Sequence, residues 1–183
     1  MFNTEHLYNL LKPKSNPSLI TDYDVIIGGT TLPADLDKGC VIINVVSSIP
    51  VTSQNKDLKN IEIKVIDTVE LGVITESSTI EITYQLDFYK VNAPNLQYIE
   101  VEREAFKVRE YLKGYETLEY LEALNSSILP CYSQIVFSSE LYNKKLTNRA
   151  TFEFKILTLC EIKEYSKIAK SAVIENLEIM KGS

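Results

Sequence analysis

Residues 80–89 have the sequence Ile80-Glu81-Ile82-Thr83-Tyr84-Gln85-Leu86-Asp87-Phe88-Tyr89, and this stretch decides the fold. Large apolar side chains fall at every second position, whereas polar side chains and Tyr89 fill the positions between them. Because neighbouring side chains of a strand point to opposite faces, the alternation predicts an antiparallel strand with one packed face. We expect the other face to be solvated or to bind a partner.

The chain then changes from a strand period to a helix period. Between residues 93 and 113, apolar side chains recur in steps of three and four residues at Tyr98, Val101, Ala105, Val108 and Leu112. This spacing places them on one helix face and predicts the main helix of the fold. Asn92 is expected to cap its start, Pro94 suits its first turn, and Gly114 is expected to end it.

Other segments predict further strands and short helices. Helices are expected at residues 6–11, as a docking element, and 116–124; strands are expected at 25–27, 40–46, 61–70, 131–137, 150–162 and 172–179, with a connection at 72–78. We expect 61–70 and 80–89 to form a long hairpin. The predicted fold is α+β, a mostly antiparallel (mixed) sheet with short helices packed beside the main one.

Bulk composition limits the possible functions. The chain has 183 residues, 45% of them hydrophobic, and a net charge of −6. This size predicts a single domain over residues 1–183, with an irregular region at 1–38 and a sheet and helix core at 40–180. An acidic balance disfavours a DNA-binding groove. With no long apolar run or signal-like start, we expect a protein made in a cytoplasm, with no membrane partner.

The residue types that commonly act in catalysis or metal binding do not predict an enzyme here. The single histidine, His6, excludes a multi-histidine site in one subunit and is expected on the surface or in a helix cap. The three cysteines lie far apart and predict reduced core thiols. Glu100 and Glu104 have Arg103 and Lys107 nearby, which predicts a solvated helix face. We therefore expect no catalytic residue, no metal and no cofactor.

Asp87 stands out because an acidic residue is disfavoured inside a strand. It implies an edge, a partner or a hydrogen-bonding neighbour, while solvent exposure and an interface role are equally compatible with the sequence.

One segment resembles a known family. The string Tyr84-Gln85-Leu86-Asp87-Phe88-Tyr89, followed by Asn92-Ala93, resembles the strand that marks the phage neck or tail terminator family. The similarity extends from about residue 78 to 179. Residues 127–132 resemble the family's Leu-Pro-aromatic step, and residues 148–152 resemble the Arg-plus-aromatic start of its last long strand. The chain departs from the family at Lys90 and Ala150, and residues 57–78 find no match.

This resemblance implies a structural role in a virion. Tail terminators form a ring, commonly of six copies, that stops the growth of the tail tube and offers a surface to the head connector. The implied partners are further copies of the chain, the tail tube protein and the head-tail connector protein, with DNA passing through the lumen. The implied location is the tail or neck of a phage or prophage particle, after synthesis in the bacterial cytoplasm. An acidic lumen would repel phosphate and let the genome slide.

Two alternatives stay open beside the terminator. One is another connector, such as a stopper or completion protein. The other is a small-molecule-binding α+β domain, since the 11 tyrosines of the chain could line a pocket.

The polar face of the strand and the charged helix face supply the candidate interface residues. Thr83 shares this strand face, and charges of both signs suit the unlike contacts of a ring. The candidates are Glu81, Gln85, Asp87, Tyr89, Arg103, Lys107, Arg109 and Arg149.

Overall fold

The computed structural model describes residues 2–12, 23–29, 38–51, 60–66, 69–91, 99–130, 133–142 and 145–167. These residues belong to two compact units. Unit 1 comprises Met1–Pro50 and Ile80–Leu159, and unit 2 comprises Val51–Thr79 and Cys160–Ser183. The expectation of one domain over residues 1–183 stays a prediction.

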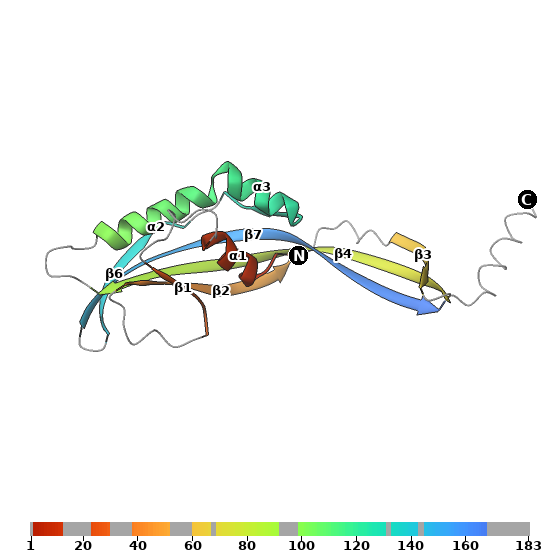
Figure 1. Ribbon diagram of the computed structural model, residues 1–183, viewed down its shortest axis with the longest axis horizontal. Coiled ribbons are helices and arrows are strands. Elements are labelled where there is room, and N and C mark those ends of the chain that lie inside the picture. The colour runs from red at the N-terminus through yellow and green to blue at the C-terminus, as the bar shows by residue number, and fades with distance from the viewer. Residues whose placement is uncertain are drawn as a thin grey trace, which may run out of the picture. The chain divides into compact units, whose positions relative to one another are not determined.

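The α+β fold class is confirmed (Figure 1). The elements in chain order are α1 (Thr4–Leu11), β1 (Asp24–Ile27), β2 (Cys40–Pro50), β3 (Asn60–Ile66), β4 (Val69–Val91), α2 (Ile99–Leu112), α3 (Tyr115–Ala123), β5 (Ser126–Ile128), β6 (Val136–Tyr142) and β7 (Lys145–Lys167). The sheet has the order β1-β2-β4-β7-β5, with β3 also paired to β4 and β6 also paired to β7. Because β1 and β2 are parallel and the other pairs with a described register are antiparallel, the sheet is mixed.

The core of unit 1 lies between one sheet face and the helices (Figure 1). The apolar face of the deciding strand is buried as predicted. Its side chains stack on β7, where the ring centroids of Tyr84 and Phe154 are 5.8 Å apart and those of Phe88 and Phe152 are 6.0 Å apart. The predicted apolar face of α2 is also buried, at Val101, Ala105, Val108 and Leu112. Aromatic contacts and the packing of α2 therefore bury this face of the sheet.

The first helix is part of this core, so the prediction that it is only a docking element is wrong. Leu7 and Leu11 are fully buried in the main apolar cluster. The helix begins with a capping box, in which the Asn3 side chain accepts from the backbone of His6 and the His6 ring accepts from the backbone of Asn3. This satisfies backbone donors that the first turn leaves without partners. The expectation of a surface or cap histidine is confirmed.

The predicted long hairpin is wrong. Residues 80–89 of β4 pair with β2, whereas β3 pairs with residues 69–75 at the start of β4. The turn also lies elsewhere, because Ile66 pairs directly with Val69, and the expected connection at 72–78 is continuous strand. Gly72, at the start of the expected connection, sits opposite Ile63 in the ladder. A glycine weakens a strand but keeps its N–H and C=O for pairing, so pairing with a neighbour can retain it.

Further boundaries differ from the predictions. The strand expected at 131–137 is replaced by β5 and β6, and Cys131 itself lies outside the described residues. β7 is longer at both ends than the predicted 150–162. The main helix ends at Leu112, close to its expected end before Gly114, and Gly114 also caps the start of α3. The expected helix start at Asn92 and Pro94, and the expected strand at 172–179, also fall outside the described residues.

Candidate functional site

A polar face of the sheet lies on the side of β4 that the helices do not cover. The alternation that buries Tyr84 and Leu86 against the helices turns Glu81, Gln85 and Asp87 to the opposite side. The neighbouring strands add side chains that bond to them. They are Asn44 from β2 and Arg149, Thr151 and Lys155 from β7, while Ser47 from β2 donates to Thr83 on the same face. Five of the eight predicted interface residues lie on this face.

Asp87 is the centre of this face and is buried, with 2% of its surface exposed. Its Oδ2 accepts hydrogen bonds of 2.8 Å from Asn44 Nδ2 and of 2.8 Å from Gln85 Nε2. Its Oδ1 accepts from Arg149 Nε at 3.2 Å and Nη2 at 2.9 Å, and from the Thr151 hydroxyl. These donors offset the cost of removing a carboxylate from water. Of the explanations for an acidic residue in this strand, hydrogen-bonding neighbours within the chain are the one observed.

Arg149 is held between this carboxylate and an aromatic ring. Its Cζ lies 5.4 Å from the centroid of the Tyr89 ring, a cation–π distance. Burial lowers the pKa of Arg149, but the hydrogen bond and the charge of Asp87 outweigh it and leave the pKa raised. Because Arg149 is engaged inside the chain, we assign it to holding β7 against β4.

Two groups on the same face stay protonated near neutral pH. Burial, followed by the charge of Asp87, raises the pKa of Tyr89 to about 12, although Arg149 opposes the shift. Burial, followed by the charges of Asp24 and Asp87, raises the pKa of the Cys40 thiol to about 12. A nucleophilic thiolate or a general base requires a pKa near the working pH. Neither side chain suits such a role.

The polar face is more open toward the far end of β2. There Lys155 Nζ lies 2.7 Å from Glu81 Oε1, with 41% and 24% of the two side chains exposed. Ser47 donates to the Thr83 hydroxyl at 3.0 Å. Exposed ion pairs of this kind stabilise a fold weakly. We therefore expect the pair of Lys155 and Glu81 to add little to the stability of unit 1.

The other predicted residues lie on α2. Arg103 and Lys107 both pair with Glu104, at 3.5 and 2.9 Å. Glu104 is buried, so the expected solvated face is wrong at this position, because the two cations cover its carboxylate. Arg109 lies over Phe106, with its Cζ 5.1 Å from the ring centroid. Charged side chains therefore frame an exposed phenyl ring.

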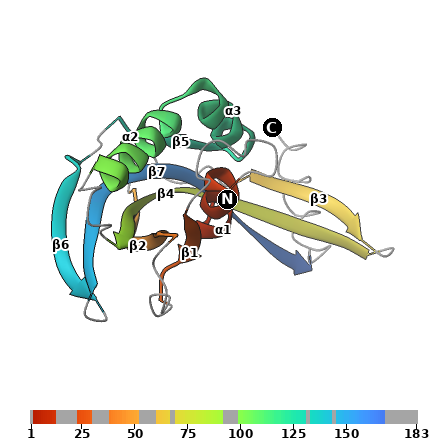
Figure 2. The same cartoon turned by 60° about the vertical axis from the view of Figure 1, so that its left-hand side comes forward.

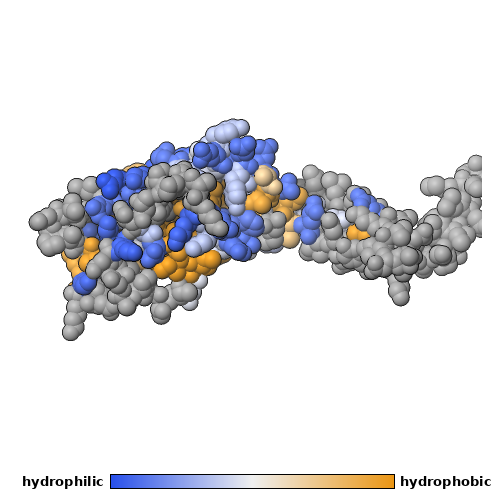
Figure 3. Space-filling view, in the orientation of Figure 1, coloured by the Kyte–Doolittle hydropathy of each residue, from blue (hydrophilic) through white to orange (hydrophobic). Residues whose placement is uncertain are grey.

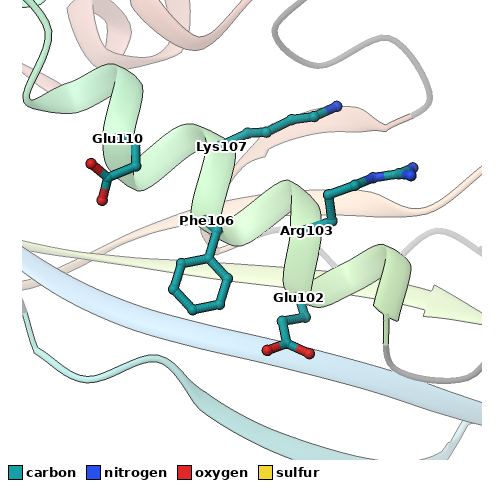
Figure 4. Close-up of a pocket in the computed structure, with 5 residues that line it drawn as sticks. All are labelled: Glu102, Arg103, Phe106, Lys107 and Glu110. Atoms are coloured by element: carbon teal, nitrogen blue, oxygen red, sulfur yellow. The ribbon is translucent and has the colours of Figure 1, made fainter.

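This phenyl ring lines an open depression of about 570 Å³ on the outer side of α2. Phe106 lies between Glu102 and Glu110 along the helix, while Arg103 and Lys107 extend on the other side (Figure 4). Drug-sized ligands prefer enclosed apolar pockets with few polar groups. The depression on α2 is open rather than enclosed, so it differs from such a pocket. Its described lining residues include no tyrosine.

The sequence singled out Arg149 but missed the other partners on this face, which are Asn44 and Thr151 around Asp87 and Lys155 beside Glu81. Asn44 interrupts a run of β-branched residues from Cys40 to Val46, so a polar side chain in an apolar strand was the available signal. Thr151 and Lys155 had the correct alternation in β7, but nothing local indicates that β7 lies beside β4.

In the described part of the chain, no group of three His, Cys, Asp or Glu side chains is arranged to hold a metal ion. Cys40 and Cys160 carry free thiols. No helix within the described ranges has the length and apolar character to cross a membrane. No family model and no curated protein matches this sequence.

Proposed function

We propose that this protein is a structural subunit of a phage or prophage neck, of the tail terminator kind. In this proposal it caps the tail tube as a ring, commonly of six copies, and offers a surface for joining the head. The resemblance at Tyr84–Ala93 supports it, and residues 84–91 of that segment belong to the central strand of unit 1. The role needs no catalytic group.

The observation that carries the proposal is that exposed apolar side chains occur on two unlike strand segments of unit 1. One group is on the far half of β2, at Val45, Val46 and Ile49, and the other on the β6–β7 hairpin, at Val136, Leu141 and Leu146. Apolar side chains reach the surface over β1 and β2 and again at the β6–β7 end (Figure 3). Clustered exposed apolar residues mark interaction sites.

Two unlike patches suit a ring. A head-to-tail contact joins one patch of a subunit to a different patch of the next, and it closes into a ring when the rotation permits. A two-fold dimer would need only one self-complementary patch. The net charge of −6 fits a lumen that repels DNA.

The outer face of α2 is the third surface in this proposal. Phe106 is 40% exposed and is flanked by Arg103 and Lys107. A phenyl ring within a charged rim resembles the anchor of a protein interface. We assign this face to the tube or the connector, and Asp87 and Arg149 to supporting the sheet.

Deletion of the gene from the phage or prophage that carries it tests the function. A terminator predicts overlong tails without heads in electron micrographs, restored to normal by the gene in trans. Tails of normal length beside heads that lose DNA would indicate a stopper or completion protein instead. Normal tails joined to filled heads would contradict both. The open shape of the α2 depression does not support the alternative of a small-molecule-binding domain.

A further inference from the structure

Half of β2 forms an open edge of the sheet. β1 pairs with β2 only from Cys40 to Ile43, and the last bond of this side runs from Gly28 N to Ile43 O at 2.7 Å. Beyond Ile43, β2 pairs with β4 on its other side as far as Pro50. Among the described residues, no strand lies along the β1 side of this second half.

The direction of the backbone N–H groups also indicates that the second half of β2 is an edge of the sheet. Val51 N donates to Thr79 O at 2.8 Å, so this N–H points to β4. Because successive N–H groups of a strand alternate in direction, those of Ser48 and position 50 point to the open side. Position 50 is proline, which has no N–H and occurs in strands where none is needed for pairing. The register shift at Val46 is likewise typical of sheet edges.

This edge carries no charged side chain to discourage pairing, and its protection is limited to the bulge at Val46 and to Pro50. Natural edge strands often carry lysine or another charge that discourages a second strand. From Cys40 to Val51 the sequence has no charged residue, and Ile49 is 55% exposed. A strand that pairs here would meet apolar and serine side chains only.

The sheet of unit 1 has a second, different open edge at β6. β6 pairs with β7 from Val136 to Tyr142, and β6 lies at the opposite edge from β1 and β2 (Figure 2). No strand in the described ranges pairs with the other side of β6. Leu141 is 77% exposed, and Glu140 is the only charged residue from Val136 to Tyr142.

We infer that β2 of one copy pairs edge to edge with β6 of the next copy, so that the sheet of unit 1 continues from subunit to subunit. The inference rests on the proposed ring and names its contact. A second copy fits because the chain carries both halves of the contact. The segments also match in character, with Val45-Val46-Ser47-Ser48 on one side and Val136-Phe137-Ser138-Ser139 on the other. Pairing these two segments buries few charged side chains. The desolvation cost of closing the ring is therefore small.

Cysteine cross-linking tests this contact directly. Ser48 and Ser138 are exposed and lie in the middle of the two edges, so a short bis-maleimide reaches between them whichever way the strands run. The parent protein carries Cys131→Ser and Cys160→Ser, and it keeps Cys40 because that thiol is fully buried.

The inference predicts a ladder of covalent oligomers from the double variant Ser48→Cys/Ser138→Cys. A mixture of the two single variants should give covalent dimers only, and each single variant alone should give none. A control pair, Ser48→Cys with Leu118→Cys on the exposed side of α3, should not form the ladder.

The other outcomes separate the contact from the ring. Covalent dimers from Ser48→Cys alone would indicate β2–β2 pairing and overturn the inference. Rings seen by native mass spectrometry without cross-links in the double variant would overturn this contact and leave the proposed function standing. A monomer without cross-links would also overturn the contact, and the deletion phenotype would then judge the function by itself.

Discussion

Arg149 donates two hydrogen bonds to one carboxylate oxygen of Asp87, 62 residues earlier in the chain, from Nε at 3.2 Å and from Nη2 at 2.9 Å. This pair joins β7 to β4 on the face opposite the helices. Together with Asn44, Gln85 and Thr151, it turns a disfavoured strand residue into the centre of a satisfied polar cluster.

Replacing Asp87 by alanine should therefore be costly. Asp87→Ala leaves the Arg149 guanidinium partly buried without its carboxylate, and we expect a loss of about 3 kcal/mol in the free energy of unfolding. Glu81→Ala is the matched control on the same strand face, because its exposed pair with Lys155 should contribute at most about 1 kcal/mol. Urea denaturation measures both. Equal losses would show that the Asp87 cluster has no special role.

Stability should fall at alkaline pH because of Cys40 and Tyr89. Both have a pKa of about 12 in the fold, against 9.0 and 10.0 for the free groups. A raised pKa means that the unfolded chain loses these protons first, so their contribution is complete below about pH 9 and is lost toward pH 12. Each group adds about 1.4 kcal/mol per pH unit to the slope between its two pKa values.

The variant Tyr89→Phe separates this effect from general alkaline denaturation. It keeps the ring beside Arg149 and removes the titrating hydroxyl, so the stability curve between pH 10 and 12 should become less steep. Thermal unfolding across that pH range is the measurement. An unchanged slope would show that the environment of Tyr89 is not the one described.

Local patterns predicted faces well but pairing poorly. The spacing of Val101, Ala105, Val108 and Leu112 fixes one helix face without reference to the rest of the chain, and that face is buried. Choosing a partner for residues 80–89 depends on contacts that are distant in sequence. The strand expected at residues 61–70 is the nearest in sequence, whereas β2, further back in the chain, is the actual partner.

The candidate site was predicted in part for the same reason. Alternation correctly placed Glu81, Gln85 and Asp87 on one face, but it cannot tell whether a neighbouring strand supplies donors to that face. Burial of Asp87 depends on Asn44 and Arg149, which come from two other strands. The sequence could single out an unusual aspartate, and only the sheet order explains it.

The first helix should be essential to stability. Leu11 is fully buried in the core, so Leu11→Ala should lower the free energy of unfolding by about 2–5 kcal/mol. Leu118→Ala removes the same atoms from an exposed position on α3 and should cost about 0.5 kcal/mol or less. Chemical denaturation compares the two. Similar values would restore the sequence-based view of this helix as a loose docking element.

A charge on the open edge of β2 should prevent assembly without unfolding the subunit. Ile49 is exposed on this edge, and Ile49→Lys adds the protective charge that natural edges carry. We expect a monomer in sedimentation experiments, with a melting temperature close to that of the parent. Leu118→Lys, which places the same charge on α3, should still assemble. Assembly by Ile49→Lys would argue against this edge as a contact.

Native mass spectrometry of the purified protein, over a concentration and magnesium series, tests the central claim that this subunit forms a ring. We expect a closed species, most directly six copies of the 20.8 kDa chain, that persists on dilution as a single stoichiometry. A protein that stays monomeric at every concentration, or that forms an open series of oligomers without a preferred size, would contradict it.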